Sequence, residues 1–564
     1  MVGLPRITYL RATSRTFMRA SWDRRFGFSL LSIVLLTGCS GTSGSMGPSV
    51  DVVVMDAGVN DGEAPVMDAM PAPDASPMGK LLFVSPDDSS DGDGRRRTPF
   101  GSIEAAYGVA VPGDIVVLLP GEYSGLMGPP EGVLVQGSGA DVTSIQGPVV
   151  LRAARVGLSE VSVVGGRPAL TVDGTATVDT VTLRDAPAAL VVTGELEARE
   201  LRVSEVRDAS AEPRSFDGPT PSSGAAVRVA DGGRLVWRGG GISRCDWVGL
   251  RNLGEASLDG VNIRDLGGPG LVNEAGLLDG RRLQVERVSA AAVLVLGGDI
   301  ELEDSSVRDT EETPLVPLRS GVAAYGGTAL LSAIDIARVN RGLRLSRGAQ
   351  VIVSGVQITQ PTIDGVSMDE ARIDGARVTV VGARNTGLSA VSESEINLTQ
   401  LEIQDVGRIG LLVNGSTAHV EGLTVAGSDG RGVTLSGAQG TLSGIHLSRI
   451  QNVGIQVSDP GGPQTIQNGV IERSSTSGIA LTGRQHEVVI SGVTVSAIAI
   501  GDAGLGEGIH LFRARGALIG VTSHGNAGAG VLVEESTLRS DGLAVRENAG
   551  PGIVLIGSGP ETAL

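Results

Sequence analysis

A four-residue phrase organises the hydrophobic pattern of the chain. A glycine, or alanine or proline in a few early copies, precedes two aliphatic residues that flank one variable residue, as in Gly432-Val433-Thr434-Leu435. The phrase returns about every 22 residues from residue 148 onward, a period typical of solenoid proteins. Its second residue is always valine, leucine or isoleucine. In order, these residues are Val149, Leu170, Leu190, Val227, Leu250, Leu271, Val293, Val322, Leu343, Val366, Leu388, Leu411, Val433, Ile455, Ile479, Ile509, Val531 and Ile553.

Successive side chains on a β-strand alternate between its two faces, so this row is expected to point inward and to stack from coil to coil. Each coil has a second apolar group about ten residues later, such as Leu423 with Val425. Two or three short strands per coil, separated by turns at Gly, Asn and Asp, predict an all-β parallel β-helix of about 18 coils. A leucine-rich repeat is not indicated, because its Leu-x-x-Leu-x-Leu frame is absent.

Three gaps between copies of the phrase are longer than the rest. The extra residues, near 208–224, 310–320 and 498–507, all come just before the start of a phrase. We therefore expect these insertions to leave the solenoid at one corner. There they would border a groove over the first strand of each coil.

The segment that precedes the repeats predicts a cap. It contains a strand at 80–84, a helix from Ser102 to about residue 110 with Ser102 as its N-cap, and a strand at 115–119. Phe83-Val84-Ser85-Pro86 through Pro120-Gly121-Glu122-Tyr123 resembles the N-terminal cap of right-handed parallel β-helix proteins of the pectin-lyase-like superfamily. The resemblance implies a right-handed, single-stranded solenoid, with residues 80–147 as cap and first coils and 148–564 as repeats.

The first 38 residues have the order of a secretory signal: six arginines, an apolar run over 26–36, and then Leu36-Thr37-Gly38-Cys39. These four residues resemble a bacterial lipobox, which implies lipidation of Cys39, for example with palmitate, and export to the cell envelope. Ser40 after the cysteine favours the outer membrane. An ordinary signal peptide or a buried cysteine is the alternative. Residues 39–79 are acidic and rich in Gly, Pro and Ala, and they predict a disordered tether between membrane and body.

The net charge is -18, with 63 acidic residues against 45 basic ones. So acidic a chain repels phosphate backbones, which argues against nucleic acid as a partner. The two cysteines, Cys39 and Cys245, cannot form a disulfide framework.

The variable position of the phrase points outward and would line the groove. It carries no acidic residue along the chain. Glycosidases pair two carboxylates about 5 to 9.5 Å apart, and the outward Asp173, Glu274, Asp369 and Glu534 are several coils apart. The Asn-Thr-Asp, Asp-Asp and Arg-Ile-Lys motifs of polygalacturonases are also absent. The candidate groove residues are Arg228, Arg251, Trp237, Trp247, Tyr325 and His510, and for the two tryptophans local packing is favoured over stacking on a sugar.

No confident metal site or cofactor is indicated. Calcium is an open possibility at an aspartate-rich loop in the cap, formed by Asp87, Asp88, Asp91 and Asp93. An exposed turn is the alternative for this loop. His510 and His524 lie within one coil and are candidates for acid–base chemistry, with scattered surface histidines as the alternative reading.

Two functions follow from these patterns. The first is a non-catalytic, envelope-anchored lipoprotein whose solenoid presents a binding or structural surface to a polysaccharide or an envelope protein. The alternative is a polysaccharide lyase, hydrolase or epimerase with an atypical site, in which Arg228 and Arg251 act as electrophiles. The sequence leaves the question of catalysis open and leans toward the first function.

Overall fold

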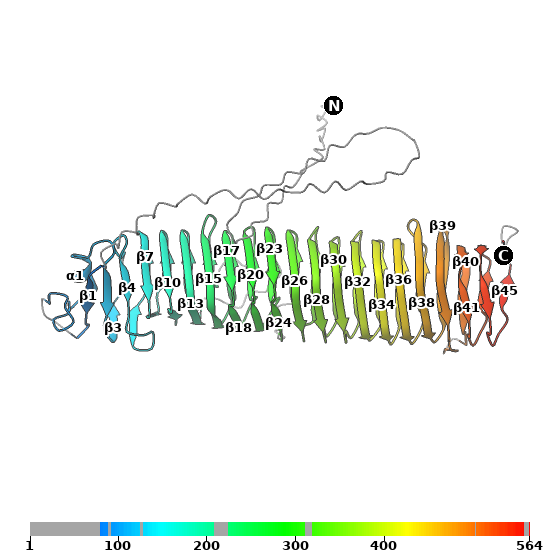
Figure 1. Cartoon of the computed structure of the whole chain (residues 1–564), viewed down its shortest axis with the longest axis horizontal. Helices are drawn as coiled ribbons and strands as arrows, with labels where there is room; N and C mark the ends of the chain where they lie inside the picture. Colours follow the sequence, from blue (N-terminus) through cyan, green and yellow to red (C-terminus); the bar gives the residue numbers. More distant parts are fainter. Residues whose placement is uncertain are drawn as a thin grey trace, which may run out of the picture. The chain divides into compact units, whose positions relative to one another are not determined.

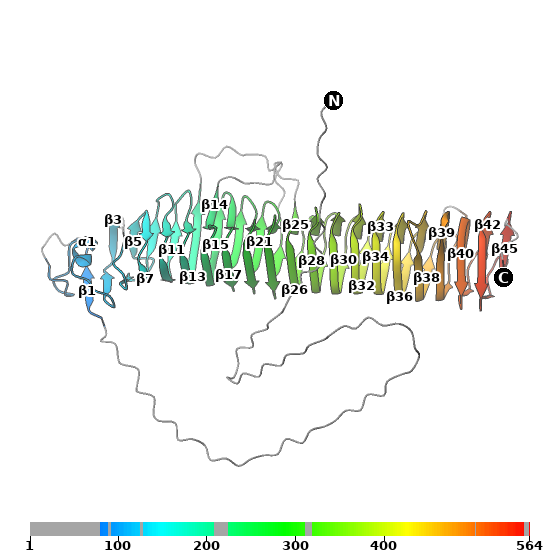
Figure 2. The ribbon, with the colours of Figure 1, turned by 90° about the horizontal axis from the view of Figure 1, so that it is seen from above.

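The structure is a computed structural model that describes residues 79–87, 92–124, 128–207, 224–310, 319–501, 504–557 and 563. The chain divides into two units, Met1–Asp74 and Ala75–Leu564. The first unit, with the expected signal segment, Cys39 and most of the tether, lies outside the described residues. The second unit is a parallel β-solenoid whose strands follow one another along a single axis (Figures 1 and 2).

Three stacked parallel sheets, here called sheets 1, 2 and 3, build the solenoid. Each coil passes through them in that order. Sheet 1 contains β6 (Val149–Leu151), β9 (Leu170–Val172), β12 (Leu190–Val192), β14 (Ala225–Val229), β16 (Val248–Asn252), β19 (Leu271–Asn273), β22 (Val293–Val295), β25 (Ser320–Tyr325), β27 (Arg341–Ser346), β29 (Asp364–Asp369), β31 (Thr386–Val391), β33 (Ile409–Asn414), β35 (Arg431–Ser436), β37 (Ile455–Ser458), β42 (Val531–Glu534), β45 (Ile553–Ile556) and the first parts of β39 (Ser477–Ser496) and β40 (Glu507–Ile519).

The strands of the other two sheets are either separate or continuous around the corner that joins them. Sheet 2 alone contains β1 (Leu81–Val84), β2 (Ile115–Leu118), β4 (Leu134–Gln136), β7 (Ala154–Ser159), β10 (Thr175–Asp179), β17 (Glu255–Asp259), β20 (Leu277–Arg281), β23 (Asp299–Glu303) and β43 (Thr537–Asp541). Sheet 3 alone contains β3 (Gly121–Ser124), β5 (Thr143–Gln146), β8 (Ser162–Val164), β11 (Thr182–Arg184), β18 (Asn262–Leu266), β21 (Gln284–Val288), β24 (Ser306–Arg308), β41 (Thr522–His524) and β44 (Ala544–Arg546). Strands in both sheets are β13 (Glu195–Val206), β15 (Arg234–Cys245), β26 (Thr328–Ala337), β28 (Gln350–Thr359), β30 (Arg372–Val381), β32 (Glu395–Val406), β34 (Thr417–Ser428), β36 (Gln439–Ile450) and β38 (Gln464–Ser474). The later part of β39 also passes through both sheets, and the later part of β40 lies in sheet 2.

The predicted inward row of the phrase is confirmed. Every member from Val149 to Ile553 is the direct register partner of the next, through unbroken parallel pairing in sheet 1. All of these side chains are buried except Ile553, on the last strand, which is 37% exposed.

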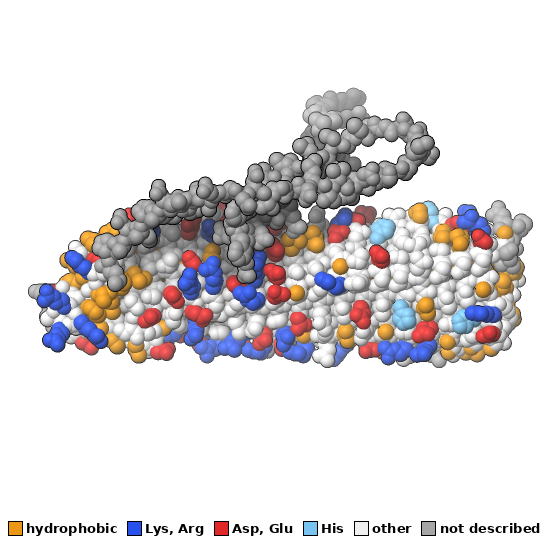
Figure 3. All heavy atoms as spheres, in the orientation of Figure 1, with side chains coloured by type: hydrophobic (Ala, Val, Ile, Leu, Met, Phe, Trp, Pro, Cys, Tyr) orange, Lys and Arg blue, Asp and Glu red, His pale blue; other side chains and the backbone are white. Residues whose placement is uncertain are grey.

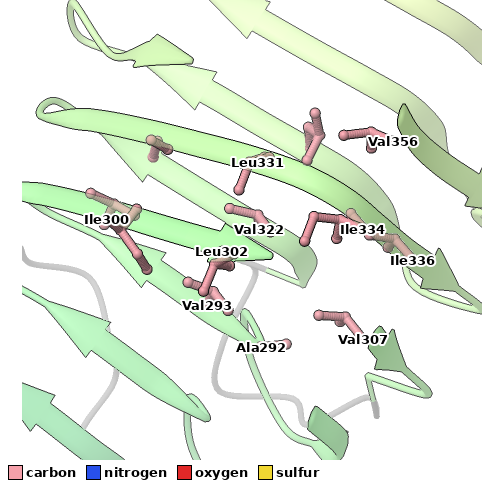
Figure 4. Close-up of a cluster of buried hydrophobic side chains, with 14 of the residues drawn as sticks. Ala292, Val293, Ile300, Leu302, Val307, Val322, Leu331, Ile334, Ile336 and Val356 are labelled. Carbon is pink, nitrogen blue, oxygen red and sulfur yellow. The ribbon is translucent and has the colours of Figure 1, made fainter. Parts of the chain in front are cut away.

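The core is a continuous column of aliphatic side chains. Figure 4 shows its construction, with Val293 and Val322 from sheet 1 facing Leu302 and Leu331 from sheet 2 and Ile336 from sheet 3. Each fully buried side chain of this kind contributes about 1.5–3 kcal/mol relative to an exposed one. Because each coil contacts only its neighbours, this stabilisation accumulates along the solenoid.

The glycine of the phrase is required by close packing. A Cβ added to Gly387 would lie 2.5 Å from Cγ2 of Ile403, which belongs to sheet 3 of the same coil, and 2.6 Å from the carbonyl oxygen of Gly410. Any larger residue would push the two walls of the coil apart.

Corners are formed by single residues with a left-handed backbone. At the corner that follows sheet 3, the residues of six successive coils have φ between 50 and 58° and alternate in charge. They are Glu205, Arg244, Asp265, Arg287, Asp309 and Arg338. We call this row the corner ladder. Three of its contacts are ion pairs: Arg244 with Glu205 at 2.8 Å, Arg287 with Asp265 at 2.6 Å and Arg338 with Asp309 at 2.5 Å.

The predicted cap is confirmed in its helix and both strands. The helix α1 (Ile103–Tyr107) is shorter than expected, and the Ser102 hydroxyl accepts a hydrogen bond from the Ala105 amide at 3.2 Å. Ile103 and Ala106 are buried against the core.

All three insertions leave the solenoid at the corner between sheets 3 and 1, as predicted. They connect β13 to β14, β24 to β25 and β39 to β40. Residues 208–223, 311–318 and 502–503 of these insertions lie outside the described part.

The described helix is too short and too polar to cross a membrane. Cys245 is a buried, unpaired thiol, and burial raises its pKa to about 12.

Candidate functional site

The outward side of sheet 1 carries most of the candidate residues. Arg228, Arg251 and Arg344 occupy the variable position of the phrase on β14, β16 and β27. Arg228 is exposed, and Arg251 and Arg344 are partly buried. Arg228 and Arg344 are five rungs apart, or about 24 Å at the usual spacing of neighbouring strands.

Between these arginines the outward side of sheet 1 is apolar and buried. Val272, Leu294 and Ala323 hold the variable position on three consecutive rungs, and their side chains are 0 to 6% exposed. With Val248 and Ala291 they form a hydrophobic cluster that is separate from the main core, and Leu296 and Tyr325 pack against it. The structure thus places a second, smaller hydrophobic cluster on the outer surface of the solenoid, which the sequence did not reveal.

On two neighbouring rungs, β16 and β19, one interior position carries a polar side chain. Asn252 and Asn273 point inward, are fully buried, and bond to each other, with Nδ2 of Asn252 donating to Oδ1 of Asn273 at 2.8 Å. The Asn273 amide also donates to the carbonyl oxygens of Gly276 and Asp299 at 3.0 and 3.1 Å. On β19 the usual arrangement of the coil is therefore inverted, with Val272 buried outside and Asn273 buried inside.

An ion pair borders the outer apolar cluster. Arg251 Nη2 lies 2.8 Å from Glu274 Oε2, and the two side chains are only 16% and 14% exposed. Both side chains of the contact are therefore largely shielded from solvent, and the Glu274 carboxylate is engaged by Arg251. Arg251 is likewise committed to Glu274 rather than free for a ligand.

Tyr325, which packs against the outer hydrophobic cluster, is in contact with two arginine side chains. The guanidinium carbons of Arg344 and Arg347 lie 5.5 and 5.8 Å from the centre of its ring, within the range of cation–π attraction. Burial raises the pKa of Tyr325, while Arg344, Arg347 and Arg341 oppose that rise. We call Tyr325, Arg344 and Arg347 the arginine–tyrosine site.

The arginines of this site differ in their partners. Arg341 is paired with Asp364 at 3.3 Å, and Asp364 also accepts hydrogen bonds from Asn385 and from the Thr386 amide. Neither Arg344 nor Arg347 forms an ion pair with a described residue. Two guanidinium groups are therefore held in place by an aromatic ring with their hydrogen-bonding edges unoccupied by carboxylate.

Sequence reasoning identified Tyr325 but did not list Arg344 or Arg347 as site residues. Arg344 was visible in the outward row. Arg347 lies in the turn after β27, with φ 56°, where the period of the phrase makes no statement about side-chain position.

Trp237 does not belong to the outward face, which corrects the prediction that made it a candidate for the groove. It lies in sheet 2, where its register partners are Ala198 and Leu258, and its side chain is fully buried in the core. The inward alternation of β15 decides its direction. Trp247 lies just before β16, at the border of sheet 1, where a Cβ on Gly224 would be 3.2 Å from its ring.

His510 lies on the outward side of sheet 1, as predicted. Its Nε2 is 3.4 Å from Glu534 Oε2 on the next rung, without the geometry of a hydrogen bond. His524 is in sheet 3, so the two histidines belong to different faces of the coil.

The outward carboxylates of sheet 1 remain far apart. Glu274, Asp369 and Glu534 stand near the ends of their strands, and at least four rungs, or about 19 Å, separate any two of them. A glycosidase pair needs about 5 to 9.5 Å.

The proposed calcium loop is described only in part, since Asp88 and Asp91 lie outside the described residues. Asp93 accepts hydrogen bonds from the Thr98 hydroxyl and, at 3.3 Å, from the Arg95 amide, and chiefly the Thr98 bond lowers the pKa of Asp93. Within the part of the chain that the structure describes, no three acidic, histidine or cysteine side chains gather as metal ligands.

The stacked sheets and the inward row define the fold of the chain as a parallel β-helix, and a family match over part of the repeats identifies it as right-handed. Residues 386–549 match the family described as "Right handed beta helix region".

Solved structures similar to the chain include a PL6 family alginate lyase, at 10% identity over 86% of this chain and 100% of that one, with a TM-score of 0.30. The catalytic unit of a GH87 alpha-1,3-glucanase from Streptomyces thermodiastaticus is 15% identical over 85% of this chain and 71% of that one, with a TM-score of 0.21. The Dettilon tailspike protein is 10% identical over 78% and 69%, with a TM-score of 0.22. Likeness at this level carries no argument about activity. No curated protein matches the chain.

Proposed function

We propose that the β-helix binds an acidic polysaccharide on the outward side of sheet 1 and does not cleave it. The observation that carries the proposal is the arginine–tyrosine site, in which Arg344 and Arg347 lie against the Tyr325 ring and have no carboxylate partner among the described residues. Carboxylate and sulfate are the anionic groups of acidic sugars. Guanidinium groups bind both of them through paired hydrogen bonds.

The local charge supports this ligand against the charge of the whole protein. The chain carries a net charge of -18, and acidic and basic side chains lie side by side along the lower edge of Figure 3. Among the described residues, three arginines lie around Tyr325, with Asp364 paired to Arg341 and the exposed Asp369 one rung beyond Arg344. An anionic polymer that lies parallel to the solenoid axis would contact Arg344 and Arg347 and, about 24 Å away, Arg228.

Binding without cleavage is favoured by the state of the carboxylates. Glu274 and Asp364 are each bonded to an arginine, and Asp369 and Glu534 are too far from one another to act on one glycosidic bond.

One observation favours the alternative, an enzyme. His510 Nε2 and Glu534 Oε2 lie 3.4 Å apart on neighbouring rungs, and if this contact tightened into a hydrogen bond on ligand binding, the carboxylate would orient the imidazole for proton transfer. Loss of polymer cleavage in a His510→Ala variant would establish this second function.

We also propose that the protein is exported and held at the outer membrane by lipid on Cys39. The support is the sequence alone: the arginine-rich start, the apolar run over 26–36 and the lipobox-like Leu36-Thr37-Gly38-Cys39. Mass spectrometry of the N-terminal peptide and membrane fractionation test the anchor. A Cys39→Ser variant should be released from the membrane fraction.

The binding proposal is tested with the purified chain from residue 40 onward, by calorimetry with alginate and polygalacturonate. We expect the Arg344→Ala, Arg347→Ala double variant to bind either polymer about 10 to 100 times more weakly, because two charge-assisted contacts are lost. An Arg449→Ala variant removes an exposed arginine on another corner and is the matched control.

The same samples are assayed for cleavage, through the ultraviolet absorbance of unsaturated ends and through new reducing ends. Polymer binding that survives the double substitution unchanged contradicts the assignment of the site. Cleavage by the unmodified chain contradicts the non-catalytic function.

A further inference from the structure

Sheet 3 carries a hollow that is separate from the outward side of sheet 1. Its volume is about 670 Å³, within the range of about 300–1,000 Å³ that small-ligand sites occupy. It lies over β8, β11, β13, β15 and β18, on the outward side of five successive coils.

Two glycines create the hollow. In sheet 3 the outward positions of three successive rungs are Arg202, Gly241 and Asn262. A Cβ on Gly241 would lie 2.1 Å from the carbonyl oxygen of Asn262, and one on Gly240 would lie 2.1 Å from that of Leu201. The close approach of the rungs excludes side chains at Gly240 and Gly241. The outward side chains of the neighbouring rungs therefore surround a depression whose base is backbone.

The lining is polar, and arginines outnumber carboxylates among its charged residues. Four arginines from four different coils border the hollow, against two carboxylates, Asp141 and Glu200. The arginines are Arg184, Arg202, Arg244 and Arg264. The remaining polar groups are chiefly hydroxyls of serine and threonine and the Asn262 side chain.

The arginines are not equally available. Arg184 is paired with Asp185 at 2.9 Å, Arg244 with Glu205 at 2.8 Å, and Arg264 lies 3.9 Å from Asp265. Arg202 is exposed and forms no ion pair with a described residue. The Oδ1 atom of Asn262 is buried and accepts no hydrogen bond within the described part of the chain.

This combination matches one class of ligand. A free guanidinium suits a carboxylate or a sulfate ester, while hydroxyl, amide and carboxylate groups around it suit sugar hydroxyls, which both donate and accept hydrogen bonds. We propose that the hollow is a second saccharide site, which takes an acidic sugar residue with its anionic group on Arg202. A chain with sites on two faces can join two polysaccharide strands.

The test uses short ligands, so that each site is counted separately. Calorimetry is performed with a hexasaccharide of uronic acids, a sulfated hexasaccharide and a neutral glucose hexasaccharide. The starting protein is the Arg344→Ala, Arg347→Ala variant, in which only the hollow should bind. We expect one remaining site per chain for at least one of the two anionic ligands and none for the neutral one.

Adding Arg202→Ala should weaken that remaining site about tenfold or more, and Ser243→Trp should block it by filling the hollow. The matched control is Arg546→Ala, which removes an exposed arginine from the far end of the same sheet. Circular dichroism checks that every variant keeps its fold.

The proposal is overturned if the starting variant retains no binding, or if the retained binding is unchanged by both Arg202→Ala and Ser243→Trp. Failure of the sheet 1 proposal gives a different result. In that case the double substitution at Arg344 and Arg347 would leave the binding of the unmodified chain unchanged, while Arg202→Ala would still weaken it.

Discussion

The two sides of sheet 1 obey different rules. On the inward side, eighteen successive rungs carry only valine, leucine or isoleucine at one position, and seventeen of these side chains are buried. One residue further, on the outward side, the same rungs carry arginine, serine, threonine, glutamine, histidine and aliphatic residues. The fold constrains the first side through close packing and leaves the second free to acquire a ligand site.

The comparison has one exception, and it adjoins the candidate site. At β16 and β19 the interior holds Asn252 and Asn273, while Val272 is buried on the outer side. Natural proteins depart from a regular pattern mainly where function requires it. The arginine–tyrosine site packs against this inverted segment through Tyr325.

The largest expected difference is between neighbouring residues of one strand. Leu388→Asp places a charge in the core and should cost about 4–5 kcal/mol or prevent folding, whereas Ser389→Asp on the outward side should change stability by about 0.5 kcal/mol or less. Urea unfolding followed by circular dichroism measures both. Similar midpoints for the two variants would contradict the inward and outward assignment.

The inverted rungs sharpen the comparison. Asn273→Val restores the aliphatic interior but leaves buried carbonyl oxygens without donors, so it should destabilise the protein by about 3 kcal/mol. Asn414→Val, at an exposed position of β33, is the control and should be nearly neutral. Stabilisation by Asn273→Val would mean that the buried amide is replaceable by simple packing.

The glycine of the phrase can be replaced by alanine on two different rungs, one closely packed and one open. In Gly387→Ala the new methyl group meets Cγ2 of Ile403 at 2.5 Å, and we expect a loss of about 2 kcal/mol. Gly552→Ala occupies the same position on the last rung, where the nearest atom is 3.7 Å away, and should have little effect. Equal melting temperatures for the two variants would show that the close approach is easily relieved.

The smallest effect is expected at the corner ladder. Arg287 and Arg338 lower the pKa of Asp265 and Asp309. A carboxyl whose folded pKa lies below its unfolded value of about 3.9 stabilises the protein above that pH, and the contribution is lost as the pH falls through the folded pKa. Because these pairs are well exposed, each should contribute at most about 0.5 kcal/mol.

Acid unfolding of an Asp265→Asn, Asp309→Asn variant tests this expectation. The variant should be slightly less stable than the unmodified chain at pH 7, and the difference should vanish once the pH has fallen below the lowered pKa of the two carboxyls. Asp405→Asn is the control, because Arg449 lies 3.8 Å from Asp405 in a corner row that Gly427 interrupts. A difference that persists in acid would exclude the ion pairs as its origin.

Much of the architecture could be predicted, because the phrase repeats a single physical requirement. The inward row, the cap helix with its Ser102 N-cap and the shared corner of the insertions all follow from local alternation and spacing. Trp237 was a candidate for the groove but packs inside, as the favoured packing interpretation implied, because its direction in sheet 2 depends on the phase of β15 and not on the phrase. The hollow at Gly241 was also missed, because a glycine in a strand does not indicate which side chains of the adjacent rungs will border it.

The sequence by itself determined the repeat and the inward row, because packing against identical neighbours imposes the same residue class on every coil. It also showed that the outward positions of the phrase lack a carboxylate pair. The tertiary structure alone decided that Arg344 and Arg347 meet the Tyr325 ring and that Arg202 lies beside Gly241 without an ion pair to any described residue. Residues about 20 to 40 positions apart become neighbours there, because stacking sets adjacent coils about 4.8 Å apart, and no repeat constrains which side chains they carry outward.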